Sequence, residues 1–253
     1  MNKVVLITGA SSGIGKDLAL LLAKNDYSLL LTGRNKTPLE ELKEKLKDKV
    51  LDIFIHDLSK EEECINLFNE VQKYHVDILI NNAGFGVFGE FINNDLDKEL
   101  DMLKTNVIAP QILMKLFLKD FESRSIEGMI VNVCSAASFY PGPLMACYYA
   151  TKSYLYRLTL ALQIEEKKRK SKNHLMAICP GPIKTNFQNV ADVSFASHAV
   201  SSEYIARAIF KGIKKKKRVV IPTFTMKCGK FFSHFVSDRF MSKVAYHFQK
   251  KKR

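Results

Sequence analysis

The chain has 253 residues, 47% of them hydrophobic, which is enough for one α/β domain with a sizeable core. It contains no uninterrupted apolar run of about 18 residues, and its five cysteines never form a C-x-x-C pair, so we expect neither a membrane-spanning helix nor a disulfide-stapled secreted scaffold. No cluster of cysteines and histidines predicts a metal site, and the first residues, MNKVVLITGA, lack the layout of a signal peptide. These features favour a reduced, cytoplasmic compartment.

The net charge of +13 is concentrated in the last part of the sequence. Residues 209–253 hold 14 Lys or Arg against a single acid, Asp238, and so account for the whole excess. The rest of the chain is balanced, and no recognition motif accompanies the lysines, so nucleic acid is not expected as a partner.

Seven short apolar runs predict the buried strands of a sheet. They lie at residues 3–10, 27–34, 50–58, 76–84, 128–135, 174–181 and 218–222. Helical spacing of apolar residues, with first-turn acids or an early proline in two cases, predicts helices at residues 15–25, 37–49, 60–74, 95–121, 148–170 and 202–213. Strands that alternate with helices predict a parallel, doubly wound sheet with right-handed crossovers, which is a Rossmann-type α/β fold.

No internal repeat or linker divides residues 1–222, which we assign to a single domain. Residues 186–200, NFQNVADVSFASHAV, lack clear periodicity and are expected to form a mobile loop. Residues 223–253 form a basic, amphipathic extension rather than a separate domain.

A glycine-rich turn, TGASSGIG, joins the first strand to the first helix. Glycine admits backbone conformations that other residues resist, and it lets the chain approach a pyrophosphate at the N-terminus of the helix that follows. A purely structural tight turn is the alternative. We expect a dinucleotide here, bound through residues Gly9, Ser11, Ser12, Gly13, Ile14 and Gly15.

The end of the second strand indicates which dinucleotide is bound. An acid at this place would bind the adenosine ribose hydroxyls of NAD, but the sequence reads LLLTGRN and puts Arg34 there. A guanidinium binds a 2′-phosphate, and no carboxylate is present to repel one, so NADP(H) is the predicted cofactor. The alternative is that Arg34 is a solvated loop residue. Asp57 and Leu58 end the third strand, where an adenine ring would lie, and Asn82, Ala83 and Gly84 end the fourth.

The segment YYATKSYLYR, residues 148–157, holds two tyrosines close to a lysine. A free tyrosine has a pKa of about 10, which is too high for proton transfer near neutral pH, and a nearby ammonium lowers it. Tyr148 lies four residues before Lys152 and Tyr149 lies three before it, so both share a helix face with the lysine. The spacing alone leaves both tyrosines as candidates.

The motifs TGASSGIG, NNAG, a serine upstream of Y-x-x-x-K, and PGPIKT occur in this order. From about residue 3 to 222 the sequence therefore resembles the short-chain dehydrogenase/reductase family, in its short single-domain branch. The family pattern places a serine 13 residues before the active tyrosine, which is Ser135 counted from Tyr148 and Ala136 counted from Tyr149. The resemblance thus favours Tyr148. Tyr246 and Lys250 repeat the Y-x-x-x-K spacing without an upstream strand-end serine, and we interpret them as surface residues.

The resemblance also implies roles for these residues. Tyr148 would protonate the substrate oxygen, Ser135 would hydrogen-bond it, and Lys152 would lower the pKa of the tyrosine and hold the nicotinamide ribose. Asn106, in LKTNVIAP, would hold a helix open for a water in a proton relay with the lysine. Contacts with the nicotinamide end are expected from Pro180, Gly181, Ile183 and Thr185.

These features predict an NADPH-dependent oxidoreductase that reduces a carbonyl to an alcohol or performs the reverse reaction. Apolar residues around the motifs favour a hydrophobic ketone, sterol or acyl-type substrate; they are Phe85, Phe88, Phe139, Tyr140, Pro141, Leu144, Phe187 and Phe195. The alternative is that several of these side chains pack the hydrophobic core and do not contact a substrate. The alternative function is a catalytically silent NADP-binding scaffold or a membrane-recruited regulator with the same fold.

The extension carries Phe232, Phe235, Val236, Phe240, Val244 and Phe248 at near-helical spacing, with basic residues elsewhere. Such a helix has three roles open to it: peripheral contact with an anionic membrane, cover of the substrate pocket, or a subunit interface. We expect the protein to form a homodimer or a homotetramer.

Overall fold

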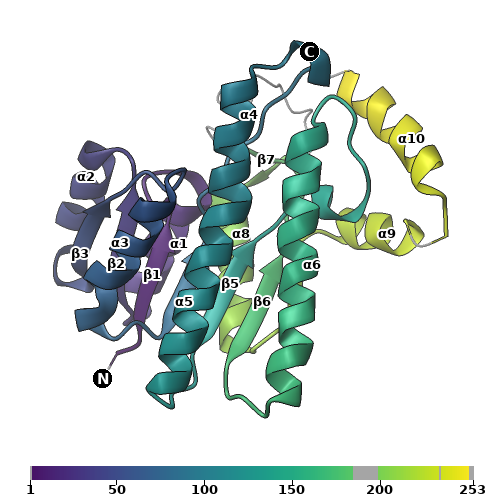
Figure 1. The fold of residues 1–253 in the computed structure, drawn as a ribbon. Coiled ribbons are helices and arrows are strands. Elements are labelled where there is room, and N and C mark those ends of the chain that lie inside the picture. The colour runs from purple at the N-terminus through teal and green to yellow at the C-terminus, as the bar shows by residue number, and fades with distance from the viewer. Residues whose placement is uncertain (1, 185–198, 234, 251–253) are drawn as a thin grey trace.

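The computed structural model describes residues 2–184, 199–233 and 235–250. Seven parallel strands form one sheet in the order β3-β2-β1-β4-β5-β6-β9 (Figure 1). They are β1 (Val4–Thr8), β2 (Ser28–Gly33), β3 (Val50–Ile55), β4 (Ile78–Asn81), β5 (Met129–Val133), β6 (His174–Ile178) and β9 (Val219–Val220). The strand order reverses between β1 and β4, and ligands of doubly wound folds bind at the carboxyl ends of the strands next to such a switch point. The predicted α/β fold is therefore confirmed.

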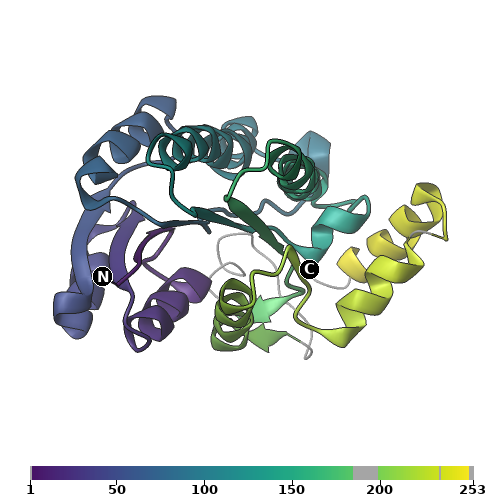
Figure 2. The same ribbon diagram turned by 90° about the horizontal axis from the view of Figure 1, so that it is seen from below.

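Helices cover both faces of the sheet, as Figure 2 shows end-on. One face packs against α1 (Gly13–Ala23), α2 (Lys36–Leu46) and α8 (Ser202–Lys214), and the other against α3 (Glu61–Val71), α5 (Ala109–Ser123) and α6 (Ala146–Lys168). Strand β1 shows why its sequence is apolar throughout: Val5 and Ile7 enter the first layer, whereas Leu6 enters the second. Burial on both sides fixes the strands and so positions the turns that follow them.

The predicted helix at residues 95–121 is not regular. It consists of α4 (Leu96–Leu103), a π-helical turn (Lys104–Ile108) and α5. π-turns arise where an extra residue is accommodated in a helix, often at functional sites. Asn106 lies in this turn and is almost fully buried.

Short 3₁₀ turns complete the main body; they are η1 (Lys47–Lys49), η2 (Gln72–Tyr74), η3 (Phe91–Asn93) and η5 (Ala136–Phe139). A separate two-stranded sheet pairs β7 (Ile183–Lys184) with β8 (Val200–Ser201) in parallel. The predicted mobile loop lies outside the described residues, except for its last two positions. Of these, Val200 belongs to β8.

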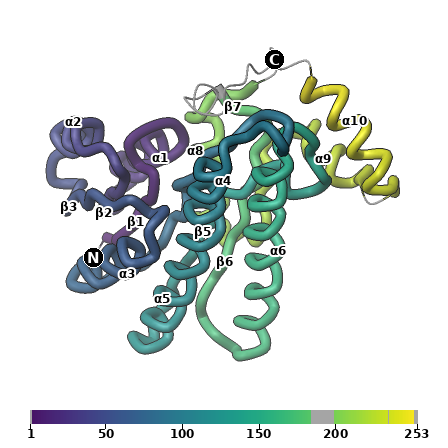
Figure 3. Tube along the Cα trace, turned by 45° about the horizontal axis from the view of Figure 1, so that its top comes forward, coloured from purple at the N-terminus to yellow at the C-terminus, as the bar shows by residue number. Residues whose placement is uncertain are grey.

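The C-terminal extension forms two helices, α9 (Phe224–Phe232) and α10 (Asp238–Lys250), instead of one amphipathic helix. They make a hairpin, drawn in yellow-green to yellow, that projects from the β9 side of the molecule beyond α6 (Figures 1 and 3). In the part of the chain that the structure describes, no helix is long and apolar enough to cross a membrane.

Candidate active site

The glycine loop has a backbone that only glycine fits comfortably. Gly9 and Gly13 have φ angles of +63° and +53°, in the left-handed region. A Cβ on Gly9 would lie 2.9 Å from the Cα of Ala83, and one on Gly15 would lie 2.4 Å from the carbonyl oxygen of Gly9. The loop is therefore folded tightly against the segment that follows β4.

Thr8 and Asn82 lock these two segments together. The Thr8 hydroxyl accepts hydrogen bonds from the backbone N–H groups of Asn82 and Ala83, both at 2.9 Å. The Asn82 amide in turn donates to the carbonyls of Thr8 and Gly9, at 2.9 and 3.0 Å. We did not predict a role for Thr8, although a polar residue at the carboxyl end of an apolar strand was a usable signal.

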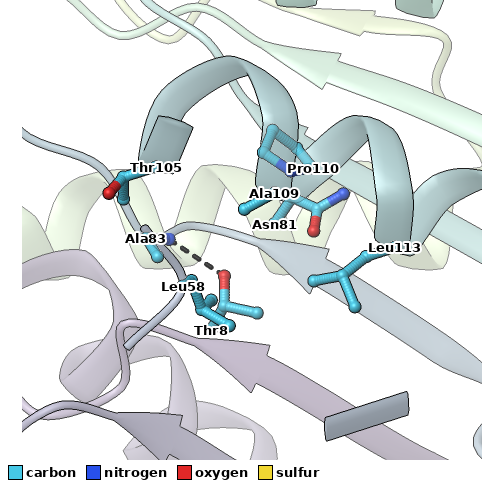
Figure 4. Close-up of a pocket in the computed structure, with 8 residues that line it drawn as sticks. All are labelled: Thr8, Leu58, Asn81, Ala83, Thr105, Ala109, Pro110 and Leu113. Carbon is cyan, nitrogen blue, oxygen red and sulfur yellow. Dashed lines mark hydrogen bonds between the residues drawn. The ribbon is translucent and has the colours of Figure 1, made fainter. Parts of the chain in front are cut away.

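Figure 4 shows the Thr8–Ala83 bond at the edge of a small pocket. It is lined by Thr8, Leu58, Asn81, Ala83, Thr105, Ala109, Pro110 and Leu113. The pocket has room for about one water molecule, far less than a substrate needs. It lies beneath the NNAG segment and is a packing space of the scaffold.

The loop and the first turn of α1 fit the diphosphate of a dinucleotide. Ser12 is exposed at the N-cap of α1 and makes no capping hydrogen bond, and the first turn contains no acid. The N–H groups of this turn therefore face an anion without a competing carboxylate. Ile14, by contrast, packs on the core below the loop.

Ser11 lies over the end of β2, because a Cβ on Gly33 would lie 3.6 Å from the Ser11 hydroxyl oxygen. The next residue, Arg34, is exposed, and no carboxylate of the described residues forms an ion pair with it. Asp57 uses one carboxylate oxygen to accept bonds from the N–H and hydroxyl of Ser59, at 3.1 and 2.9 Å. Leu58 is buried next to this turn. These residues fit the adenosine side of the same cofactor.

Ser135, Tyr148 and Lys152 meet at the carboxyl end of β5. Ser135 follows β5 and caps η5 by accepting a bond from the N–H of Ala137 at 3.1 Å. Tyr148 lies in the first turn of α6 and is hydrogen-bonded to Ser135. The ammonium of Lys152, one turn later, is 5.9 Å from the centroid of the Tyr148 ring and donates to the carbonyl of Val133 at 3.0 Å.

Asn106 joins this group from the π-turn. Its side-chain oxygen accepts from the N–H of Phe85 at 3.1 Å, and its amide donates to the Phe85 carbonyl at 2.8 Å and to the Thr151 hydroxyl at 3.1 Å. A Cβ on Gly84 would lie 2.8 Å from the Asn106 side-chain oxygen and 3.3 Å from the Lys152 nitrogen. Asn106 and Lys152 thus flank Gly84 at the end of the NNAG segment. Thr151 is a second residue that we did not predict, although it neighbours the Y-x-x-x-K lysine.

A family model described as short chain dehydrogenase matches residues 3–193. The chain belongs to the short-chain dehydrogenase family. The resemblance that the motifs carried is therefore confirmed, and the protein is an oxidoreductase that acts on alcohol or carbonyl groups with a nicotinamide cofactor.

Named relatives span almost the whole chain. The NADP-dependent 3-hydroxy acid dehydrogenase of Schizosaccharomyces pombe is 32% identical over 87% of this chain and 90% of its own. The farnesol dehydrogenase of Aedes aegypti is 28% identical over 89% of this chain and 96% of its own. A short-chain dehydrogenase from Sphingobium yanoikuyae, solved in complex with NADPH, is 27% identical and superposes with a TM-score of 0.82 over 88% of each chain.

In this short-chain dehydrogenase, burial dominates the acidity of the central groups. It raises the pKa of Tyr148 to about 12, and the hydrogen bond with Ser135 opposes that rise. Burial also lowers the pKa of Lys152. We expected the ammonium to lower the pKa of the tyrosine. In the structure the ammonium donates to the carbonyl of Val133, and burial is the largest influence on the pKa of the tyrosine.

Tyr149 points elsewhere. Its hydroxyl accepts a bond from the Gln249 amide at 2.7 Å, and its ring packs so closely on Gly142 that a Cβ there would be 2.3 Å away. Burial, with a smaller contribution from the neighbouring Tyr140 and Tyr148, also raises the pKa of Tyr149. Ser138, a polar neighbour of Ser135, donates to the carbonyl of Lys152 at 2.8 Å and supports the helix from below.

The segment after β6 closes the site on its far side. The Pro180 carbonyl accepts a bond from the N–H of Ala136 at 2.8 Å, which ties the segment to η5. Ile183 lies in β7 and pairs with Val200, whereas Thr185 lies outside the described residues. A Cβ on Gly181 would lie 3.0 Å from the Met226 side chain, so α9 covers this segment directly.

The extension also contacts the aromatic residues next to Ser135. Lys230 donates to the Tyr156 hydroxyl at 2.7 Å and lies 5.4 Å from the centroid of the Phe139 ring. Phe139 packs edge-on against Tyr156, and Tyr140 packs against Tyr149. Both contacts fit the alternative that these side chains pack the protein interior. Phe187 and Phe195 lie outside the described residues. Among described side chains, no group of three or more His, Cys, Asp or Glu is arranged to hold a metal ion.

Proposed function

We propose that this protein is an NADPH-dependent reductase of a hydrophobic ketone, sterol or acyl-type carbonyl compound, with Tyr148 as the acid and base. The observation that supports it most is the convergence of four side chains beside the glycine loop; they are Asn106, Ser135, Tyr148 and Lys152. The family establishes the reaction class, and this arrangement supports the proposed roles.

A bound nicotinamide nucleotide supplies the hydride for the carbonyl carbon. Tyr148 then donates its phenolic proton to the carbonyl oxygen, and Ser135 donates a hydrogen bond to the same oxygen. Because the pKa of Tyr148 is raised, the tyrosine carries its proton at neutral pH before the substrate arrives. Lys152 binds the nicotinamide ribose and, through Asn106 and a water, returns a proton to the tyrosine.

Cofactor contacts follow the same geometry. The glycine loop and the start of α1 hold the diphosphate, and Asn82, Ala83 and Gly84 line the path toward the nicotinamide ribose. By the family resemblance, Pro180, Gly181 and Ile183 would contact the nicotinamide end. Arg34 binds the 2′-phosphate and selects NADP over NAD. Two relatives support this choice: the NADP-dependent 3-hydroxy acid dehydrogenase and the short-chain dehydrogenase solved in complex with NADPH.

The apolar substrate class is supported by the half-buried Phe85 and Phe88 after NNAG and by the relative that is named for farnesol. We further propose a homodimer or homotetramer, because α4 exposes apolar side chains such as Leu96, which is 67% exposed. The protein would act in the cytoplasm, at the periphery of a membrane.

The test is NADPH oxidation across a panel of aliphatic, sterol and acyl carbonyl compounds. Tyr148→Phe should keep NADPH binding and lose turnover by about 10²-fold or more, because the proton donor is gone. Tyr246→Phe is the matched control, since Tyr246 is 43% exposed in the second Y-x-x-x-K sequence and should change nothing. Turnover that survives Tyr148→Phe would refute the mechanism. NADPH binding without activity on any carbonyl would favour the scaffold alternative.

A further inference from the structure

The hairpin of α9 and α10 has an inner and an outer face with different chemistry. The inner face contacts the body of the protein through Met226, Lys230 and Gln249, and it buries Ala245. These contacts cover one side of each helix with the body of the protein. They leave the opposite side, and the corner where the helices meet, to solvent (Figure 2).

Aromatic side chains gather at that outer corner. Phe231 packs edge-on against Phe232, with 5.7 Å between ring centroids, and at a tilt against Phe235, with 5.0 Å between them. The exposed fractions at the corner are 61% for Phe231, 61% for Phe232, 71% for Phe235, 36% for Val236 and 57% for Phe240. A contiguous apolar patch of this kind on a protein surface marks an interaction site rather than scattered exposure.

Basic residues lie along both helices of the hairpin. Lys227, Arg239, Lys243 and Lys250 are all exposed on the hairpin. In the sequence, residues 223–253 contain eight Lys or Arg and one acid, Asp238. The surface therefore combines insertable rings with a surplus of positive charge, which is the combination that binds amphipathic segments to anionic lipid.

The charge decides between a membrane and a second copy of this chain. Pairing two of these hairpins would bring two basic surfaces together, and the single acid of each could not neutralise them. An anionic bilayer neutralises the charge and also accepts the phenylalanine rings. We propose that the outer face of the α9–α10 hairpin, centred on Phe231, Phe235 and Phe240, docks the protein on an anionic membrane surface.

The hairpin lies close to the candidate active site, and the docking proposal does not depend on which reaction occurs there. The hairpin follows the carboxyl end of β9, so it lies at the same edge of the sheet as Ser135 and Gly181, and Met226 touches Gly181. The basic run Lys214–Lys217 precedes β9 and lies at the opposite edge. A docked protein would present its active-site edge, and not the Lys214–Lys217 edge, toward the bilayer.

Flotation of the full chain with phosphatidylcholine vesicles, with and without phosphatidylserine, tests the proposal. We expect binding only when phosphatidylserine is present, weakening as salt rises. Removing three charges with Arg239→Gln, Lys243→Gln and Lys250→Gln should weaken binding about tenfold to a hundredfold. The triple change Phe231→Ser, Phe235→Ser and Phe240→Ser should weaken it further, because the inserted rings are lost.

The matched control removes the same charge at the other edge, by Lys214→Gln, Lys215→Gln and Lys217→Gln, and should change binding less than twofold. Unchanged thermal unfolding and NADPH binding would show that each variant is folded, and Tyr148→Phe should float like the wild type, since docking does not require turnover. No binding to anionic vesicles, or equal loss in the two charge variants, would overturn the proposal. So would a phenylalanine variant that binds vesicles normally but sediments as a smaller oligomer, because the patch would then join two copies.

Discussion

Gly84→Ala should damage the site by displacing two side chains at once. Gly84 does not have a left-handed backbone, so an alanine is tolerated by the main chain itself. Its Cβ would lie 2.8 Å from the side-chain oxygen of Asn106, closer than real Cβ contacts, and 3.3 Å from the Lys152 nitrogen. Asn106 is 1% exposed and held by three hydrogen bonds, so it cannot move without breaking one.

The bond that lies nearest the new methyl group is the one from the N–H of Phe85 to Asn106, at 3.1 Å. Losing it leaves a partly buried N–H without an acceptor, which costs about 1–3 kcal/mol of the free energy of unfolding. A shift of Asn106 and Lys152 away from their present places should lower kcat about tenfold to a hundredfold, because misplacement by about 1 Å can cost that much.

Urea unfolding and steady-state NADPH oxidation measure the two effects. The matched control is Gly229→Ala in α9, where a Cβ meets no atom within 4 Å. That change should leave kcat unaltered and raise the free energy of unfolding by about 0.5–1 kcal/mol, because glycine is unfavourable within a helix. Wild-type kcat and stability in Gly84→Ala would refute the view that this glycine separates Asn106 from Lys152.

Three further predictions concern the cofactor, the proton and the second tyrosine. Arg34→Asp should raise the Kd of NADPH about tenfold to a hundredfold and leave the Kd of NADH nearly unchanged. Both values are measured by titrating the fluorescence of the reduced nucleotide, and equal effects on the two would refute the role of Arg34. Because the pKa of Tyr148 is raised to about 12, the donor stays protonated as pH rises, so kcat/KM for reduction should stay flat through neutral pH and fall only as pH approaches that pKa. The reverse oxidation needs the phenolate and should gain about tenfold per pH unit below that pKa; a reduction profile that falls near neutral pH would contradict the raised pKa. Tyr149→Phe should change turnover by less than about twofold. It should lower stability in a thermal melt by about 1–3 kcal/mol, because it removes the hydroxyl that lies 2.7 Å from the Gln249 amide. Loss of turnover would show that the two tyrosines were assigned wrongly.

Local patterns predicted the fold because each strand of a doubly wound sheet is apolar throughout and is followed by a helix. They could not predict the π-turn at Lys104–Ile108, because its sequence continues the helical pattern on both sides. The break between α9 and α10 was missed for the same reason: apolar residues at helical spacing run through it.

The sequence alone determined the reaction class, since ordered motifs at fixed spacing identified the family and named Ser135, Tyr148 and Lys152. Only the folded chain gives the two adjacent tyrosines different hydrogen-bond partners. Tyr148 is bonded to Ser135, whereas Tyr149 is bonded to Gln249, which is 100 residues away in the sequence. Tertiary structure also set the direction of the pKa shift, because burial and hydrogen bonding are not encoded in residue spacing. It likewise divided the extension into a face that covers the site and a face that is open to a partner, since only packing decides which side of a helix is left exposed.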